Sequence, residues 1–132
     1  MSLIAILTQL QATLPPIQTE NDDIITPFQE YLATCESGND PSAIGRGDIK
    51  ITGYASRGLY QYQPKTFLAK GKEYGLFPAE LTMKEAMLLI HSESIQTELT
   101  RLLIEDEQFG HWKNCYNKFL RSQKKGVPLA SR

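Results

Sequence analysis

The sequence contains few residues of the kinds that bind metals. Its 132 residues include two cysteines, Cys35 and Cys115, and two histidines, His91 and His111. The cysteines are 80 positions apart, a spacing that fits neither a CxxC redox motif nor a zinc-ligand pattern. Both histidines stand apart from other ligand-type residues, so we expect structural or surface roles for them and no metal or cofactor. The two cysteines form either one disulfide or two buried thiols.

An excess of charge and a long apolar run are also missing. The chain has 14 Lys and Arg residues against 15 Asp and Glu residues, which leaves a formal net charge of −1. This balance argues against a nucleic-acid binder, which needs a basic surface. No stretch approaches the roughly 18 consecutive apolar residues that cross a bilayer, so we expect a soluble protein without a membrane span. Residues 1–7 are apolar but lack the basic start and cleavage site of a signal peptide, so none is evident.

Charges are distributed unevenly along the chain. Residues 80–107 hold seven acids and two bases, whereas residues 113–132 hold six bases and no acid. A basic run of this kind is typically a solvated helix end followed by a frayed terminus. We therefore assign no function to it.

The composition is that of one globular domain with a mostly helical pattern. Hydrophobic residues make up 41% of the chain and charged residues 22%, and 132 residues are enough to bury a single core. Hydrophobic periodicity, caps and helix breakers predict most of the secondary structure. The predicted helices are a short one at 3–14, one from the cap at 21–23 to Cys35, one from Pro64 to Gly75, one opened by the capping box at 82–85, one capped by Ser94, and one holding Trp112, Tyr116 and Phe119. Residues 38–58 contain five glycines and a β-favouring core at 49–52, which predicts loops around a small β-hairpin.

Glu36-Ser37-Gly38 is the first segment that indicates chemistry. The predicted second helix ends there, where the helix macrodipole disfavours an anion. A carboxyl held near aromatic side chains has its pKa raised towards the value of a general acid. The three residues alone are more typical of a surface turn, so the hypothesis depends on a second segment.

That second segment is Gly58-Leu59-Tyr60-Gln61, which begins 22 residues after Glu36. At these residues the chain resembles the soluble lytic transglycosylase and goose-type lysozyme family. In that family a Glu-Ser-Gly segment closes one helix, a Gly-Leu-Met-Gln-like segment opens the next across a cleft, and a Tyr-Asn pair comes from a later helix. Tyr116-Asn117 matches the third segment only in part, because residues 114–118 replace the usual Ala-Tyr-Asn-Ala-Gly. The resemblance runs from about residue 24 to residue 119.

The resemblance implies a mostly α, lysozyme-like α+β fold with a small β-hairpin beside an active-site cleft. It makes Glu36 the catalytic acid and base and places Ser37 near the N-acetyl group of the substrate. It makes Gln61 a polar contact to a sugar, and Tyr60, which stands where methionine is common, adds a hydroxyl that a sugar can use. The implied reaction protonates a glycosidic oxygen, which is a poor leaving group until it carries a proton.

Tyr116 and Asn117 are the remaining substrate-binding candidates. In the family the late tyrosine hydrogen-bonds the catalytic glutamate and fixes its orientation, and the resemblance implies this role for Tyr116. The alternative is core packing beside Trp112 and Phe119, because aromatic residues at helical spacing are often only core.

The presence of a second carboxylate decides between two reactions. Two-carboxylate glycosidases need a partner for Glu36, and the candidates are Asp40 and Asp48. Asp40 precedes a proline and is the better turn former, whereas Asp48 can face the cleft; a solvated loop position is the alternative for both. Without a secure partner we expect a transglycosylase route, in which Glu36 protonates the leaving oxygen and then deprotonates the muramyl 6-hydroxyl that attacks the anomeric carbon.

We therefore interpret the sequence as a peptidoglycan lytic transglycosylase that cleaves the β-1,4 bond between N-acetylmuramic acid and N-acetylglucosamine and leaves 1,6-anhydro ends. The alternatives are a lysozyme-type hydrolase on the same bond and a non-catalytic glycan-binding envelope module. We expect a monomer in the cell envelope, periplasmic or extracellular, whose partners are peptidoglycan glycan strands.

The same resemblance bears on the cysteines and on the domain boundaries. Cys35 precedes Glu36 and Cys115 precedes Tyr116, so the two cysteines lie close together if both segments converge on one cleft. In an oxidising compartment we then expect a disulfide, and in a reducing cytosol two buried thiols. The expected organisation is an N-terminal helix and linker at 1–23, a lysozyme-like catalytic domain at 24–122 and a flexible basic tail at 123–132.

Overall fold

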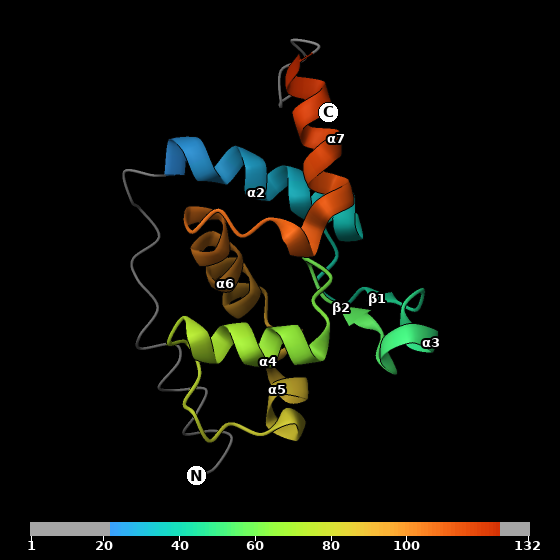
Figure 1. Ribbon diagram of the computed structural model, residues 1–132, viewed down its shortest axis with the longest axis vertical. Helices are drawn as coiled ribbons and strands as arrows, with labels where there is room; N and C mark the ends of the chain where they lie inside the picture. The colour runs from blue at the N-terminus through green and yellow to red at the C-terminus, as the bar shows by residue number, and fades with distance from the viewer. Residues whose placement is uncertain (1–21, 125–132) are drawn as a thin grey trace.

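Helices account for most of residues 22–124, which are the residues described by the computed structural model (Figure 1). This confirms the mostly helical class. In chain order the elements are α2 (Asp22–Ser37), β1 (Ile44–Gly45), α3 (Ile49–Thr52), β2 (Ser56–Arg57), α4 (Pro64–Glu73), α5 (Met83–Leu89), α6 (Glu93–Glu105), the 3-10 helix η1 (Gly110–Trp112) and α7 (Lys113–Lys124). The helix expected at 3–14 lies outside the described residues. Because α7 extends to Lys124, the first two residues of the expected tail are helical.

Local signals place several helix ends correctly. Pro64 occupies the first turn of α4, and Gly75, with φ of 77°, follows the end of that helix. The capping box at the start of α5 is formed as predicted, since the Thr82 side chain accepts from the Glu85 amide and the Glu85 carboxylate accepts from the Thr82 amide. The cap predicted for α6 is wrong by two residues. Ser92 has the extended backbone of a cap and its hydroxyl accepts from Ile95 N, whereas residue 94 already lies within the helix.

The predicted β-hairpin is present, but other residues form its strands. Strands β1 and β2 form a two-stranded antiparallel sheet in which Ile44 pairs with Arg57. The predicted β core at 49–52 is wrong, because these residues form the short helix α3, which ends at Gly53 with φ of 82°. None of its residues is buried, and the side chain of Ile51 is 83% exposed. The β-branched residues there have no facing strand to pack on, so their propensity does not decide the local structure.

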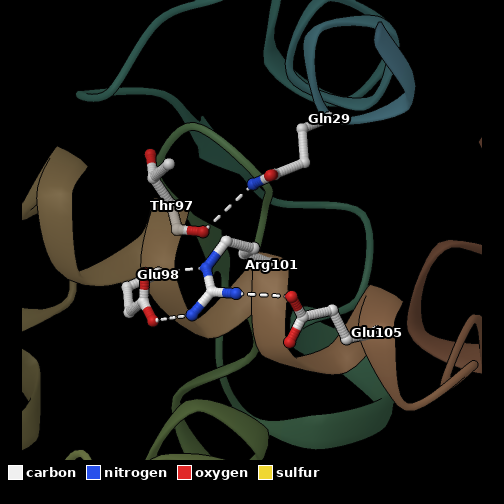
Figure 2. A network of polar contacts seen from close by, with 5 residues as sticks. All are labelled: Gln29, Thr97, Glu98, Arg101 and Glu105. Carbon is white, nitrogen blue, oxygen red and sulfur yellow. Dashed lines mark hydrogen bonds and ion pairs between the residues drawn. The ribbon is translucent and has the colours of Figure 1, made fainter. Parts of the chain in front are cut away.

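The core forms where α2 packs against α6 and α7 and where α4 packs against α5. The hairpin and α3 lie to one side of these helices (Figure 1). Figure 2 shows the junction of α2 and α6, where the buried Gln29 side chain donates to the Thr97 carbonyl at 3.0 Å. On α6 itself, Arg101 is held by Glu98 and Glu105 (Figure 2). No helix among residues 22–124 is long and apolar enough to cross a membrane.

Gln96, on α6, anchors the segment that follows β2. Its side chain is 1% exposed, its Oε1 accepts from Tyr60 N at 2.9 Å, and its Nε2 donates to the carbonyls of Arg57 and Ile90. A Cβ at Gly58 would meet the Gln96 Nε2 at 2.1 Å, so glycine is required where the segment passes over this amide. The buried amide thus fixes the path of the chain between β2 and α4.

Replacing Gln96 with alanine should destabilise the protein strongly. The substitution leaves the Tyr60 amide and the buried Ile90 carbonyl without their Gln96 partner and removes one of the two hydrogen bonds that the Arg57 carbonyl accepts, for which we expect a loss of about 2–4 kcal/mol in the free energy of unfolding. Urea denaturation of both proteins measures the difference. Gln108→Ala removes an exposed amide and should change stability by no more than about 0.5 kcal/mol. Equal effects of the two substitutions would contradict the anchoring role of Gln96.

Candidate active site

Glu36 lies at the carboxyl end of α2, where the chain turns sharply. Gly38 and Asn39 both have positive φ, at 67° and 63°. Their amides donate back to the carbonyls of Thr34 and Ala33, at 2.9 and 3.0 Å. The last turn of α2 carries no basic residue. The glutamate is therefore fixed at the negative end of a helix dipole, with no cation on its own helix turn to compensate.

Ser37 connects the two segments on which the resemblance depends. Its Oγ lies 2.7 Å from the carbonyl of Leu59 and 3.0 Å from that of Ala33, and it accepts from Asp40 N at 3.0 Å. The Glu36 segment and the segment at 58–61 are thus in direct contact, as expected. The Ser37 hydroxyl is committed to backbone groups, so its role in this structure is to join the two segments.

The Cys35–Cys115 disulfide, which the resemblance implied, is present. It links the end of α2 to the first turn of α7, with a Cα–Cα distance of 6.0 Å. A carboxylate oxygen of Glu36 lies within 4.8 Å of both sulfurs. Since each sulfur is bonded to the other, neither is a thiolate that could act as a metal ligand. The disulfide therefore forms one wall beside the Glu36 carboxyl.

The protonation of Glu36 is set by its half-buried position. Burial raises the pKa of Glu36 from its ordinary value of 4.5 to about 7, and the positive charge of Lys118, on α7, lowers it. Among the described residues, no hydrogen bond involves the Glu36 carboxyl. Its proton is therefore retained by exclusion of water and can be given to another molecule.

The Gly58–Gln61 segment forms a tight turn. Arg57 and Tyr62 pair through both backbone hydrogen bonds, at 2.9 and 3.0 Å, and Gln61 N donates to the Gly58 carbonyl. Gly58 has φ of 86° and Gln61 has φ of 54°, which is uncommon for a glutamine. The Gln61 Nε2 donates to the carbonyls of Gly58 and Ala43. Its amide nitrogen thus holds the turn against the hairpin, while its Oε1 packs over Gly45.

Tyr60 does not lie where a sugar could reach it, which corrects the role expected for it. Its side chain is 3% exposed and belongs to the core. Its amide donates to Gln96 and its carbonyl accepts from the Trp112 indole at 3.0 Å. Burial raises the pKa of the Tyr60 hydroxyl. The residue that stands where methionine is common therefore keeps an apolar core position.

For Tyr116, the structure shows the core-packing alternative. Its ring stacks on Phe109, with centroids 4.4 Å apart and planes 7° apart, and contacts Phe28 edge to face. No hydrogen bond joins Tyr116 to Glu36, although both are described. Asn117 is exposed on α7, two positions after Cys115 and so on a different face of the helix.

Asp40 and Asp48, the two candidate partners of Glu36, interact with groups other than Glu36. Asp40 accepts from the amide and hydroxyl of Ser42, at 2.9 and 2.7 Å, and these bonds lower the pKa of Asp40. It is a turn former, as its position before a proline suggested. Asp48 is exposed ahead of α3, and its charge acts on His111. Neither is among the groups that act on Glu36, so the described residues bring no second carboxylate to it.

Sequence reasoning assigned no site role to two residues that contribute to this region. His111 hydrogen-bonds the Gln61 carbonyl at 3.1 Å and stacks on Tyr62, and burial lowers its pKa, which keeps the ring neutral. Lys118 provides the positive charge that acts on Glu36. Its only signal in the sequence was membership of the basic run that begins at residue 113.

The site thus offers one carboxyl that remains protonated up to about pH 7, at the end of a helix and beside a disulfide and a lysine. Such a carboxyl can protonate a leaving-group oxygen and then, as a carboxylate, accept a proton. Comparisons with protein-family models, curated proteins and solved structures found no match to this chain.

Reduction of the disulfide should lower the stability of the protein. The bond closes a span of 80 residues, which the chain-entropy model values at about 4 kcal/mol, as an upper figure. Urea unfolding with and without a reductant measures the loss. Intact-mass measurement after alkylation gives the thiol state. Alkylation of both cysteines in native-source protein before reduction would show that the bond does not form there.

Glu36 should make stability depend on pH in a defined window. Because its pKa is about 7 when folded and about 4.5 when unfolded, the folded state binds more protons between these values. This contribution is therefore lost as pH rises from about 4.5 to about 7. In Glu36→Gln it is absent, so the variant should gain stability relative to wild type across this window. Urea unfolding of both proteins at pH 4.5 and pH 8 tests the sign. A difference that is the same at both pH values would contradict the buried acid.

Proposed function

We propose that the protein is a peptidoglycan lytic transglycosylase, with Glu36 as its catalytic acid and base. The observation that carries the proposal is the protonated, half-buried Glu36 at the end of α2, joined through Ser37 to the Gly58–Gln61 turn. The substrate is the β-1,4 bond between N-acetylmuramic acid and N-acetylglucosamine. The disulfide is compatible with the oxidising conditions of the periplasm or the cell exterior, where this substrate lies.

The first step uses the proton that burial keeps on Glu36. The carboxyl donates it to the glycosidic oxygen, the bond to the anomeric carbon breaks, and the N-acetylglucosamine side leaves as an alcohol. The pKa of about 7 suits this step, because a general acid works best when its pKa lies near the working pH.

The second step uses the carboxylate left by the first. Glu36 accepts the proton of the muramyl 6-hydroxyl, whose oxygen attacks the anomeric carbon and closes a 1,6-anhydro ring. The acid is thereby regenerated and no water is consumed. Capture within one sugar is effectively unimolecular, and such positioning contributes on the order of 7–11 kcal/mol to lowering a barrier.

The surroundings of Glu36 favour this route over hydrolysis. A two-carboxylate hydrolase needs a second acid at a set separation, either as a nucleophile or to activate water. Asp40 is used in its own turn and Asp48 acts on His111. The neighbour of Glu36 is instead a cation, Lys118. These residues therefore supply a single carboxyl, that of Glu36, which acts first as the acid and then as the base.

Digestion of purified cell-wall sacculi tests both the acid and the product. Glu36→Gln keeps the shape of the side chain but removes its proton, so turnover should fall by about 10²–10⁴-fold. The wild-type products should be muropeptides one water lighter than hydrolytic ones and resistant to borohydride reduction.

Asp48→Asn is the matched control, because it removes a carboxylate from the neighbouring hairpin and should leave the product unchanged. Reducible ends that disappear in Asp48→Asn would assign a hydrolase. Wall clearing by Glu36→Gln at nearly the wild-type rate would show that the site is wrong.

A further inference from the structure

Lys118 occupies a position that the proposed reaction does not yet use. It follows Cys115 by three residues on α7, so the two side chains lie on adjoining parts of one helix face. The Cys115 sulfur is within 4.8 Å of the Glu36 carboxylate. Arg121 follows Lys118 by three further residues. Lys118 and Arg121 are therefore neighbours on the surface of α7, and Lys118 is the one of the two whose charge acts on Glu36.

Neither cation forms an ion pair with an acid among the described residues. From residue 113 to 124, α7 contains no Asp or Glu, and the described part of the chain places no carboxylate within ion-pair distance of Lys118 or Arg121. Arg101 shows the contrast, since Glu98 and Glu105 hold its guanidinium (Figure 2). Lys118 and Arg121 are both exposed and can receive an anion from outside.

The charge of Lys118 opposes the first step of the proposed reaction. A general acid must hold its proton until the leaving oxygen takes it, and a nearby cation favours the carboxylate form. An anion bound at Lys118 would offset this effect when substrate is present. The muramyl residue supplies such an anion on its 3-O-lactyl group, either as the lactyl carboxylate itself or as a carboxylate of the attached peptide.

We propose that Lys118, assisted by Arg121, is the subsite for a carboxylate carried by the muramyl residue on which Glu36 acts. This inference rests on the proposed function, because it assumes the same glycan at Glu36. It makes the site selective for muramyl-containing strands over neutral strands of N-acetylglucosamine. It also makes Lys118 a specificity-determining residue, since it contacts the substituent and not the reacting bond.

Binding measurements on the Glu36→Gln variant test the subsite without turnover. The probes are a muramyl-containing tetrasaccharide stripped of its peptides, so that its lactyl carboxylates are free, the same tetrasaccharide with its peptides attached, and a neutral tetramer of N-acetylglucosamine. Adding Lys118→Gln should weaken binding of the carboxylate-bearing glycans by about three- to tenfold and leave the neutral tetramer unchanged. The stripped or the peptide-bearing probe, whichever loses more affinity, identifies the source of the carboxylate.

Two further variants separate the subsite from a general charge effect. Lys113→Gln removes the same charge from the same helix, two positions before Cys115 and on another face, and should leave binding unchanged. Lys118→Arg keeps the charge and should restore most of the affinity. Equal losses in Lys113→Gln and Lys118→Gln, an equal loss for the neutral tetramer, or no loss at all would each overturn the proposal.

The pH dependence of kcat and of kcat/KM in the active enzyme gives a second measurement, which would not change if Lys118 had only a structural role. In wild type, the pKa that limits kcat should lie above the pKa that limits kcat/KM, because bound carboxylate offsets Lys118 only in the complex. In Lys118→Gln the two values should coincide, and a gap that persists would count against the subsite. If wild type fails to cleave sacculi, the proposed function fails, and the binding measurements still decide the subsite.

Discussion

The candidate site depends on one buried amide, that of Gln96. Three backbone groups from two separate segments, those of Arg57, Tyr60 and Ile90, converge on this side chain. Any of them left unpaired in the core would cost stability, so the segment between β2 and α4 has little freedom to move. The Leu59 carbonyl, to which Ser37 bonds, belongs to that segment. The position of the last turn of α2, and of Glu36 on it, is therefore set from α6.

The disulfide supplies the second constraint on Glu36, and it acts from the other side. Ser37 holds the end of α2 to the Gly58–Gln61 turn through a hydrogen bond, while Cys35 holds it to α7 through a covalent bond. Glu36 lies between these two attachments. A carboxyl that is half-buried at the negative end of a helix is unfavourable when charged. Attachment on both sides keeps it there, which is why its proton is available at neutral pH.

Sequence signals worked where a few neighbouring residues decide the structure. Pro64, the Thr82 capping box and the turn at Gly38 are all of this kind, because each depends on contacts within about five residues. The convergence of the two motifs and the disulfide were reached through the family resemblance, since partners 22 and 80 residues apart leave no local signal. Mostly helical architecture followed from hydrophobic periodicity.

The sequence-based predictions that failed concern residues whose structure depends on partners far away in the chain. Residues 49–52 have β-branched side chains, but no strand faces them, so they form a short helix. Through the resemblance, Tyr60 was expected to offer its hydroxyl to a sugar, yet its backbone is held in the core by Gln96 and Trp112, which are 36 and 52 residues away. Gln96 itself escaped notice because a glutamine on an amphipathic helix usually faces water. Hydrophobic periodicity alone does not distinguish a polar residue that is buried in the core from one that is exposed on the surface.

The basic run at the end of the chain shows how the fold gives different roles to similar residues. In the sequence, Lys113, Lys118 and Arg121 are members of one series of bases without acids. The disulfide fixes which face of α7 meets α2, and the helical repeat then places Lys118 near Glu36 and Lys113 on another face. A cation in this position makes the proton of Glu36 harder to hold in the free protein. Among the described residues, the charge that acts on Glu36 is that of a lysine and not of a second carboxylate, so an anion that offsets Lys118 would make the proton of Glu36 easier to hold.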